Sequence, residues 1–339
     1  MNLATSHHET GSKIDDLREL SAELSALREG CGVYSLASRT KILVRGGDRV
    51  RWLNGMVTNN VRDLAVGHGV YAFLLNPQGH ILGDLYAYNR GKDLIVDTDQ
   101  SQSVQMLAVF DRYIIMDDVE VETLGEVGAL GVAGPKAKAV LAAVGIPVPE
   151  LQPLQFADLK WRDVDLTLVR GDNPLSESYE LWLPSAQISA LRDALIHAGA
   201  KVVGDAVLEL LRVAAGIPRY RLDIRERDLP QETEQARALN FNKGCYIGQE
   251  IVERIRSRGA VHRKFTGFNI QGELPAPGTK VELDGKEIGE ITSVASVPAE
   301  DSVHQVGLGY IRREHATPGK KVRIGGSDAS VADLPFKIS

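Results

Sequence analysis

The hydrophobic positions of the first 125 residues recur with two periods, and each period predicts one type of element. Residues 13–30 carry leucines at helical spacing, at positions 17, 20, 24 and 27, which predicts an amphipathic helix. Residues 69–90 alternate on both sides of a turn at residues 76–79, which is typical of a β-hairpin. Residues 40–61 predict a strand followed by a helix, with Asp48 as the N-cap.

Residues 126–260 repeat the same mixture of periods. Helical spacing predicts helices near residues 136–145, 188–198 and 205–215, each ended by a glycine. Shorter apolar runs predict strands at residues 127–134, 164–171 and 178–184. The chain up to about residue 260 therefore reads as two consecutive α+β modules with antiparallel hairpins.

The pattern changes near residue 262, where short apolar strands are separated by turns rich in proline and glycine. Asp284-Gly285 is a strong hairpin turn, and no helical spacing follows. This region predicts a small all-β barrel or sandwich. We expect a disordered tail at residues 1–12, α+β domains at residues 13–125 and 126–261, and a barrel at residues 262–339. These boundaries are approximate, and the expectation includes the case in which the two α+β domains exchange segments.

Composition narrows the class of protein. The chain has 339 residues and a net charge of −6, which disfavours a general coating of nucleic acid. Its two cysteines, Cys31 and Cys245, are too few for a disulfide framework or for a permanently bound metal within one chain. The sequence has no apolar run long enough to span a membrane and no signal peptide, so we expect a cytoplasmic protein. Cys31 follows a predicted helix and is interpreted as structural.

Cys245 lies in a segment with unusual neighbours, NKGCYIGQE at residues 242–250. Isoleucines at positions 247, 251 and 255 predict a helix that starts just after Gly244, which places Cys245 near its positive end. That field and the charge of Lys243 would both favour a thiolate, so Cys245 and Lys243 are candidate reactive residues. The alternative is a small buried side chain at a junction between a loop and a helix.

The string K-G-C-Y-x-G-Q-E, here residues 243–250, resembles the signature of the YgfZ family of folate-binding proteins, which support iron–sulfur enzymes. From about residue 30 to its end, the chain also resembles the wider glycine-cleavage T-protein superfamily. The segments that carry this likeness are WLNGMVTNNVRDL, LLNPQGHILGDLYAY, LLRVAAGIPRYRLDI and VGLGYIRRE. The resemblance implies two related α+β domains of ferredoxin-like type and a barrel, arranged as a three-lobed ring around a central channel for tetrahydrofolate.

The resemblance also assigns roles to individual residues. Asp84 stands where the T-protein has two consecutive acids, one of which assists one-carbon transfer, and here the pair is Gly83-Asp84. Glu180 would accept hydrogen bonds from the pterin, with Tyr179 stacking on its ring. Arg212 would bind folate carboxylates or close an internal ion pair. Asn59 and Asn76 are weaker candidates for the channel wall.

Two classes of function follow from this resemblance. In the first, the protein is a tetrahydrofolate-binding accessory factor for iron–sulfur proteins, and Cys245 acts beside the channel. In the second, it is a tetrahydrofolate-dependent aminomethyltransferase that depends on Asp84. The basic residues Arg254, Arg256 and Arg258 are interpreted as a solvated face, with RNA contact as the weaker alternative.

Overall fold

The computed structural model describes residues 20–259, 261–299 and 302–337. The described chain forms two compact units, which interleave along the sequence. Among the described residues, the first contains 20–36, 128–153 and 157–211, and the second contains 37–127, 154–156, 212–259, 261–299 and 302–337. Residues 20–29 are helical, within the helix predicted over residues 13–30. The tail predicted at residues 1–12 lies outside the described residues.

The first unit is built on a six-stranded sheet with the order β11-β1-β7-β10-β9-β8. Its strands are β1 (Gly32–Ser35), β7 (Val127–Ala133), β8 (Phe156–Trp161), β9 (Val164–Arg170), β10 (Ser178–Pro184) and β11 (Lys201–Val202). Its helices are α4 (Ala137–Ala143) and α5 (Ile188–His197). Helix α6 (Asp205–Ala214) runs from this unit into the second. Strand β1 precedes residue 125 and pairs with β7, so segments from both sides of that position share one sheet.

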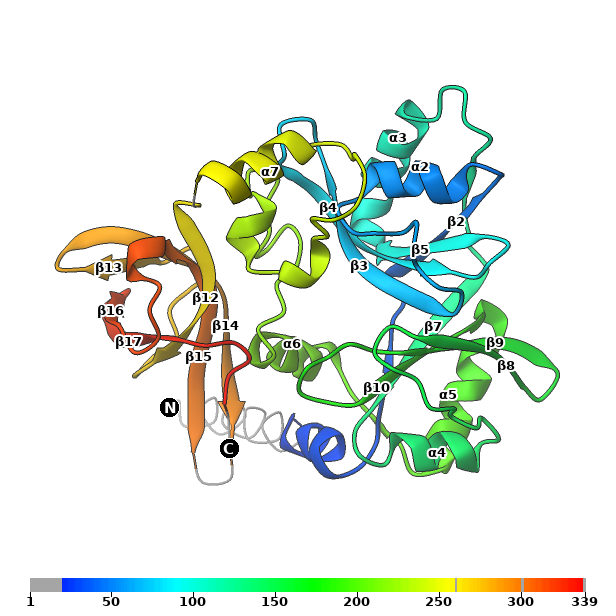
Figure 1. The fold of residues 1–339 in the computed structure, drawn as a ribbon. Coiled ribbons are helices and arrows are strands. Elements are labelled where there is room, and N and C mark those ends of the chain that lie inside the picture. Colours follow the sequence, from blue (N-terminus) through cyan, green and yellow to red (C-terminus); the bar gives the residue numbers. More distant parts are fainter. Residues whose placement is uncertain (1–19, 260, 300–301, 338–339) are drawn as a thin grey trace, which may run out of the picture. The chain divides into compact units, whose positions relative to one another are not determined.

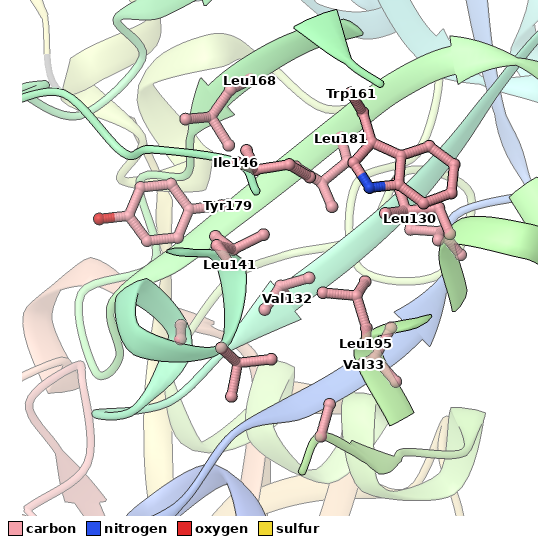
Figure 2. Close-up of a cluster of buried hydrophobic side chains, with 14 of the residues drawn as sticks. Val33, Leu130, Val132, Leu141, Ile146, Trp161, Leu168, Tyr179, Leu181 and Leu195 are labelled. Carbon is pink, nitrogen blue, oxygen red and sulfur yellow. The ribbon is translucent and has the colours of Figure 1, made fainter. Parts of the chain in front are cut away.

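The core of this sheet is a cluster of buried aliphatic side chains and two aromatic rings (Figure 2). Leu141 from α4 and Leu195 from α5 pack against strand residues such as Leu168 and Leu181. Trp161 is buried and donates its indole N–H to the carbonyl of Val144, 3.1 Å away. Cys31 is 2% exposed within the same cluster, as expected for a structural cysteine, and its burial raises the pKa of the thiol to about 11.

The second unit contains a five-stranded sheet with the order β3-β4-β5-β2-β6. Its strands are β2 (Arg39–Arg45), β3 (His68–Leu75), β4 (Ile81–Asn89), β5 (Leu94–Asp99) and β6 (Glu120–Thr123). Helices α2 (Arg49–Met56) and α3 (Gln100–Arg112) cover one face through Trp52, Leu53, Met106 and Phe110. Asp48 precedes α2, but its carboxylate accepts from the N–H of Asp118 and pairs with Arg51, so the predicted side-chain cap is absent.

The rest of the second unit follows α6 and ends in a closed barrel (Figure 1). Helix α7 (Gln249–Arg258) precedes the barrel, after short 3-10 turns at Pro230–Thr233 and Ala236–Ala238. The barrel order is β12-β15-β14-β13-β16-β17. Its strands are β12 (Arg263–Ile270), β13 (Lys280–Leu283), β14 (Lys286–Pro298), β15 (Val303–Arg312), β16 (Lys321–Ile324) and β17 (Ser327–Ala332), with a 3-10 turn at Arg313–His315. The predicted fold class, two α+β sheets and a C-terminal barrel, is confirmed.

Candidate functional site

The face of the five-stranded sheet opposite α2 and α3 carries the polar residues of the candidate site. Tyr71, Phe73 and Leu75 of β3 point to this face, because side chains alternate along a strand. They pack there against Tyr220 and other residues of the segment that follows α6. Tyr71 donates its hydroxyl to Oδ2 of Asp84 on the neighbouring strand β4, at 2.8 Å. Burial raises the pKa of Tyr71 well above its ordinary value, and the Asp84 charge adds to the rise, so the phenol stays protonated.

Gln102, in the first turn of α3, holds Asp84 from the other side. Its Nε2 donates to Oδ1 of Asp84 at 2.7 Å, and its Oε1 accepts from the backbone N–H of Asp84 at 2.9 Å. Thr98 donates its hydroxyl to the backbone carbonyl of Asp84 at 2.8 Å. The paired register of β4 with β5 begins at Tyr86, so these two side chains serve the backbone groups of Asp84 beyond the end of the ladder.

Asp84 and Tyr71 line a pocket of about 380 Å³. Four arginines also line it, Arg39, Arg212, Arg219 and Arg237, and they outnumber its two acids, Asp84 and Asp99. The Arg237 guanidinium lies 4.3 Å from the centroid of the Tyr71 ring. Tyr220 also lines this pocket and is 6% exposed. Its hydroxyl is buried and has no hydrogen-bond partner among the described residues.

Arg212 lies at the edge of this pocket and also closes an internal ion pair. Its Nη1 lies 2.7 Å from Oδ2 of Asp223, and its Nη2 donates to the hydroxyl of Ser293 on β14 at 2.8 Å. Asp223 is fully buried, so the ion pair has a structural role in joining α6 to the barrel. Of the two roles expected for Arg212, the ion pair is present in the structure, and folate contact stays a prediction.

Cys245 is exposed, in a segment that is fixed on both sides. Before it, Lys243 donates its three N–H groups to the backbone carbonyls of Asn54, Val57 and Asn59, at 2.5, 2.6 and 2.7 Å. After it, the N–H of Ile247 donates to the carbonyl of Gly55 at 3.1 Å. The segment therefore presents its thiol to solvent from a rigid base.

The prediction for the surroundings of this thiol is wrong about the start of the helix and about the direction of Lys243. Helix α7 starts at Gln249, so three residues separate Cys245 from the helix, and the helix field is confined to the first turn. Lys243 directs its ammonium into backbone carbonyls, so its role is to hold the segment in place. Burial lowers the pKa of Lys243 to about 7, and the charge of the nearby Arg62 lowers it further. The three carbonyl acceptors favour the protonated form, because only the ammonium has three N–H groups to donate.

Gly248, the last residue before α7, is required by two constraints. Its φ of +80° belongs to the left-handed region, and a Cβ would lie 2.5 Å from the backbone carbonyl oxygen of Asn76. Asn76 is part of the turn between β3 and β4, where its side-chain oxygen accepts from the N–H of His80 at 3.0 Å. The hairpin turn therefore supports the segment that carries Cys245.

Asn59 and Asn76 both have structural partners. The Asn59 amide donates to the carbonyls of Tyr71 and Arg237, both at 2.8 Å, which ties β3 to the chain before the cysteine segment. Neither asparagine is among the residues that line the pocket of Asp84. Their proposed place in a channel wall stays a prediction, as does the ring-shaped arrangement around a channel.

Tyr179 and Glu180 lie on β10 in the first unit and point to opposite faces of their sheet. The Tyr179 ring is 1% exposed and belongs to the hydrophobic core drawn in Figure 2. It therefore packs against the core, and the structure does not present it for the expected stacking on a pterin. Glu180 is half-buried and accepts the indole N–H of Trp182 at 2.8 Å. Its predicted contact with a pterin stays a prediction.

Comparison with known proteins places this geometry in a family. Residues 13–243 match the family model of the GCVT N-terminal domain, and residues 263–337 match that of the glycine cleavage T-protein C-terminal barrel domain. The chain belongs to the glycine cleavage T-protein family. The crystal structure of aminomethyltransferase T of the glycine cleavage system from Bartonella henselae has the same fold, with a TM-score of 0.85 at 24% identity over 94% of this chain and 89% of that one.

Curated relatives in this family carry the name aminomethyltransferase. The protein from Halothermothrix orenii is 27% identical over 93% of this chain and 90% of its own length. The protein from Rubrobacter xylanophilus is also 27% identical, over 94% of this chain and 86% of its own length. The family models establish the T-protein family, and they do not decide the branch within it.

Sequence analysis identified Asp84 but missed the residues that surround it. Tyr71, Gln102, Tyr220 and Arg237 all line its pocket. Tyr71 could have been identified from the sequence, because it places a hydroxyl among apolar residues of β3, directly across from Tyr86 on β4. Gln102 had none, since a glutamine in the first turn of a helix is normally solvated. Within the described part of the chain, no three His, Cys, Asp or Glu side chains gather as a metal site, and no helix is long and apolar enough to cross a bilayer.

Proposed function

We propose that this member of the T-protein family binds tetrahydrofolate in the pocket of Asp84. One observation supports the proposal above all. Tyr220 lines the same pocket as Asp84, and its buried hydroxyl has no hydrogen-bond partner among the described residues, so the pocket wall holds an unsatisfied polar group. A volume of about 380 Å³ lies within the range of small-molecule sites.

The donor set of the pocket fits a folate. The Asp84 carboxylate suits an N–H donor on the ligand, and Tyr71, Tyr86 and Tyr220 supply aromatic surface. Arg219 and Arg237 supply positive charge for the glutamate carboxylates of a folate. When bound, tetrahydrofolate would supply nitrogens that carry a one-carbon unit. Asp84 would orient such a nitrogen.

We further propose that the protein serves iron–sulfur proteins as an accessory factor and that Cys245 is the group that acts on them. The string at residues 243–250 supports this role, as does an exposed thiol on a segment fixed by Lys243 and Gly248. The thiol can ligate iron held by a partner, exchange with a partner's disulfide or accept a one-carbon unit. A cytoplasmic location is part of this proposal.

Calorimetry with tetrahydrofolate tests the pocket. We expect wild type and Cys245→Ser to bind equally, and Asp84→Asn and Glu180→Ala to bind more weakly or not at all. Asp165→Asn, an exposed acid of the first unit, is the matched control for an altered carboxylate. Failure of wild type to bind would remove folate from the proposal.

Complementation tests the thiol separately. In cells that lack the protein, Cys245→Ser should fail to restore the activity of iron–sulfur enzymes, although it binds tetrahydrofolate. Restoration equal to wild type would show that Cys245 has no such role.

Aminomethyl transfer is the second candidate function, because Asp84 faces the pocket and the curated relatives are named aminomethyltransferase. It predicts turnover of an aminomethylated carrier protein that is lost in Asp84→Asn and retained in Cys245→Ser. Turnover with this dependence would decide for the transferase and against the accessory role.

A further inference from the structure

The hydrogen bonds of Gln102 can be assigned without ambiguity. A backbone N–H is always a donor, so the atom that faces the N–H of Asp84 at 2.9 Å must be the amide oxygen of Gln102. The NH₂ group of Gln102 then necessarily faces Oδ1 of Asp84, at 2.7 Å. Because Gln102 is 3% exposed, no water competes for this amide. Its orientation is fixed by the backbone of the residue that it serves.

The position before Asp84 is adapted to this amide. A Cβ on Gly83 would lie 2.8 Å from Oε1 of Gln102 and 3.4 Å from the terminal methyl of Met106. The first distance is shorter than real Cβ contacts, so any larger residue at position 83 would displace the amide. A second acid at position 83 and the present placement of Gln102 therefore exclude each other.

The two oxygens of Asp84 differ in what they can accept. Oδ1 faces a donor that cannot turn around, whereas Oδ2 faces the hydroxyl of Tyr71, which can rotate from donor to acceptor. A proton on Oδ1 would face the NH₂ group of Gln102, which is also a donor. A proton on Oδ2 would face the Tyr71 hydroxyl oxygen, which can accept it in a hydrogen bond. The remaining charged and titratable groups of the pocket are Arg39 on β2, Tyr86 on β4, Asp99 before α3, and Arg212, Arg219, Tyr220 and Arg237.

We propose that Gln102 is a positioning residue that keeps Oδ1 of Asp84 as a hydrogen-bond acceptor only, so that Asp84 exchanges protons with a bound ligand through Oδ2. In that exchange an N–H bond of the ligand breaks, an O–H bond forms at Oδ2, and no electrons change hands. This inference rests on the proposed folate pocket for its ligand. The fixed acceptor itself is a property of the free protein.

The test compares two variants with a matched control on the same helix. Gln102→Glu keeps the oxygen that faces the backbone of Asp84 and replaces the NH₂ group by a second carboxylate oxygen. Gln100→Glu makes the same substitution at an exposed position two residues earlier. The readout is the pH titration of the Asp84 carboxyl carbon, measured by ¹³C NMR on the free protein.

We expect the Asp84 titration to shift upward and split into two coupled steps in Gln102→Glu, because two adjacent carboxylates share one proton. It should match wild type in Gln100→Glu. An Asp84 titration that is the same in both variants would overturn the inference, since it would show that the end of side chain 102 does not face Oδ1 of Asp84.

Ligand binding gives a second, independent readout. Gln102→Met removes both hydrogen bonds at nearly constant volume, and we expect it to weaken tetrahydrofolate binding by about 10- to 100-fold. Unchanged affinity would overturn the positioning role even where Gln102→Glu fails to fold. Absence of binding by wild type would instead refute the folate pocket, and the NMR titration would still decide the role of Gln102.

Discussion

At the scale of single residues, the two cysteines have opposite environments. Cys31 lies in the core of the first unit, and its burial raises the pKa of the thiol to about 11. Cys245 is exposed in the second unit. Because the thiolate is the reactive form and must be reached by the reagent, only one of the two is available in the folded protein.

We therefore expect an aromatic disulfide reagent at pH 8 to modify one thiol per folded chain and two per unfolded chain. The Cys245→Ser variant should show no fast reaction before unfolding. Fast reaction of two thiols in the folded protein would contradict the buried placement of Cys31.

Tyr220 gives a prediction in which stability and binding change in opposite directions. Its hydroxyl is buried without a partner among the described residues, which costs free energy in the free protein. Tyr220→Phe should raise the free energy of unfolding by about 1 kcal/mol and weaken tetrahydrofolate binding about tenfold. Denaturant unfolding and calorimetry measure the two effects. Loss of stability would show that the hydroxyl has a partner.

At the scale of elements, the cysteine segment depends on the turn between β3 and β4. Gly248→Ala combines left-handed strain with a collision against the carbonyl of Asn76, whereas Gly145→Ala has a similar φ of +85° and no atom within 4 Å. We expect Gly145→Ala to cost about 1 kcal/mol in the free energy of unfolding and Gly248→Ala about 3 kcal/mol or more. Equal losses in denaturant unfolding would mean that the turn does not support the segment.

The elements themselves were largely predictable, because each obeys a local period. The hairpin at residues 69–90, the helix at residues 188–198 and the all-β tail follow from spacing and turn residues alone. The interleaving of β1 with β7 depends on pairing across almost 100 residues, which no local period encodes. The start of α7 was misplaced for a similar reason, since Gly248 is fixed by a distant turn and not by helix signals.

The site was less predictable than the fold. Asp84 could be named from the resemblance to the T-protein, but Gln102 contacts it from helix α3, and Tyr220 lines the same pocket from a segment far along the chain. Lys243 was predicted to be reactive because it is a cation near a cysteine. In the structure its ammonium instead donates hydrogen bonds to three backbone carbonyls. Charge can be read from a sequence, but the direction of a side chain depends on the packing around it.

At the scale of the whole molecule, a buried charge cluster couples stability to pH. Asp97 on β5 is fully buried between Lys41, at 2.8 Å, and Arg39, at 2.9 Å. Burial opposes its ionisation, but the two cations outweigh burial and lower the pKa of Asp97 below its ordinary value of 3.8. Its contribution to stability is therefore present above pH 3.8 and is lost as the pH falls below that value.

We expect Asp97→Asn to lose about 3–5 kcal/mol of unfolding free energy at pH 7, because the buried Lys41 ammonium then loses the charge of Asp97. The same variant should lose less stability than wild type between pH 4 and pH 2, since this acid no longer titrates. Asp165→Asn, whose partner Lys160 is exposed, should unfold at the wild-type denaturant concentration. Identical acid sensitivity of wild type and Asp97→Asn would assign the pH dependence elsewhere.

The closed barrel has a consequence for how chains of this protein meet one another. A closed sheet has no unpaired strand edge, so the barrel offers no template for pairing with a second chain. The open sheets do have edges, but β11 has two residues and β6 has four, which leaves little backbone to pair. The longer edges are β3 and β8, and β8 carries Asp158 and Lys160. Aggregation at high concentration should therefore begin at β3, once the segments that cover it detach.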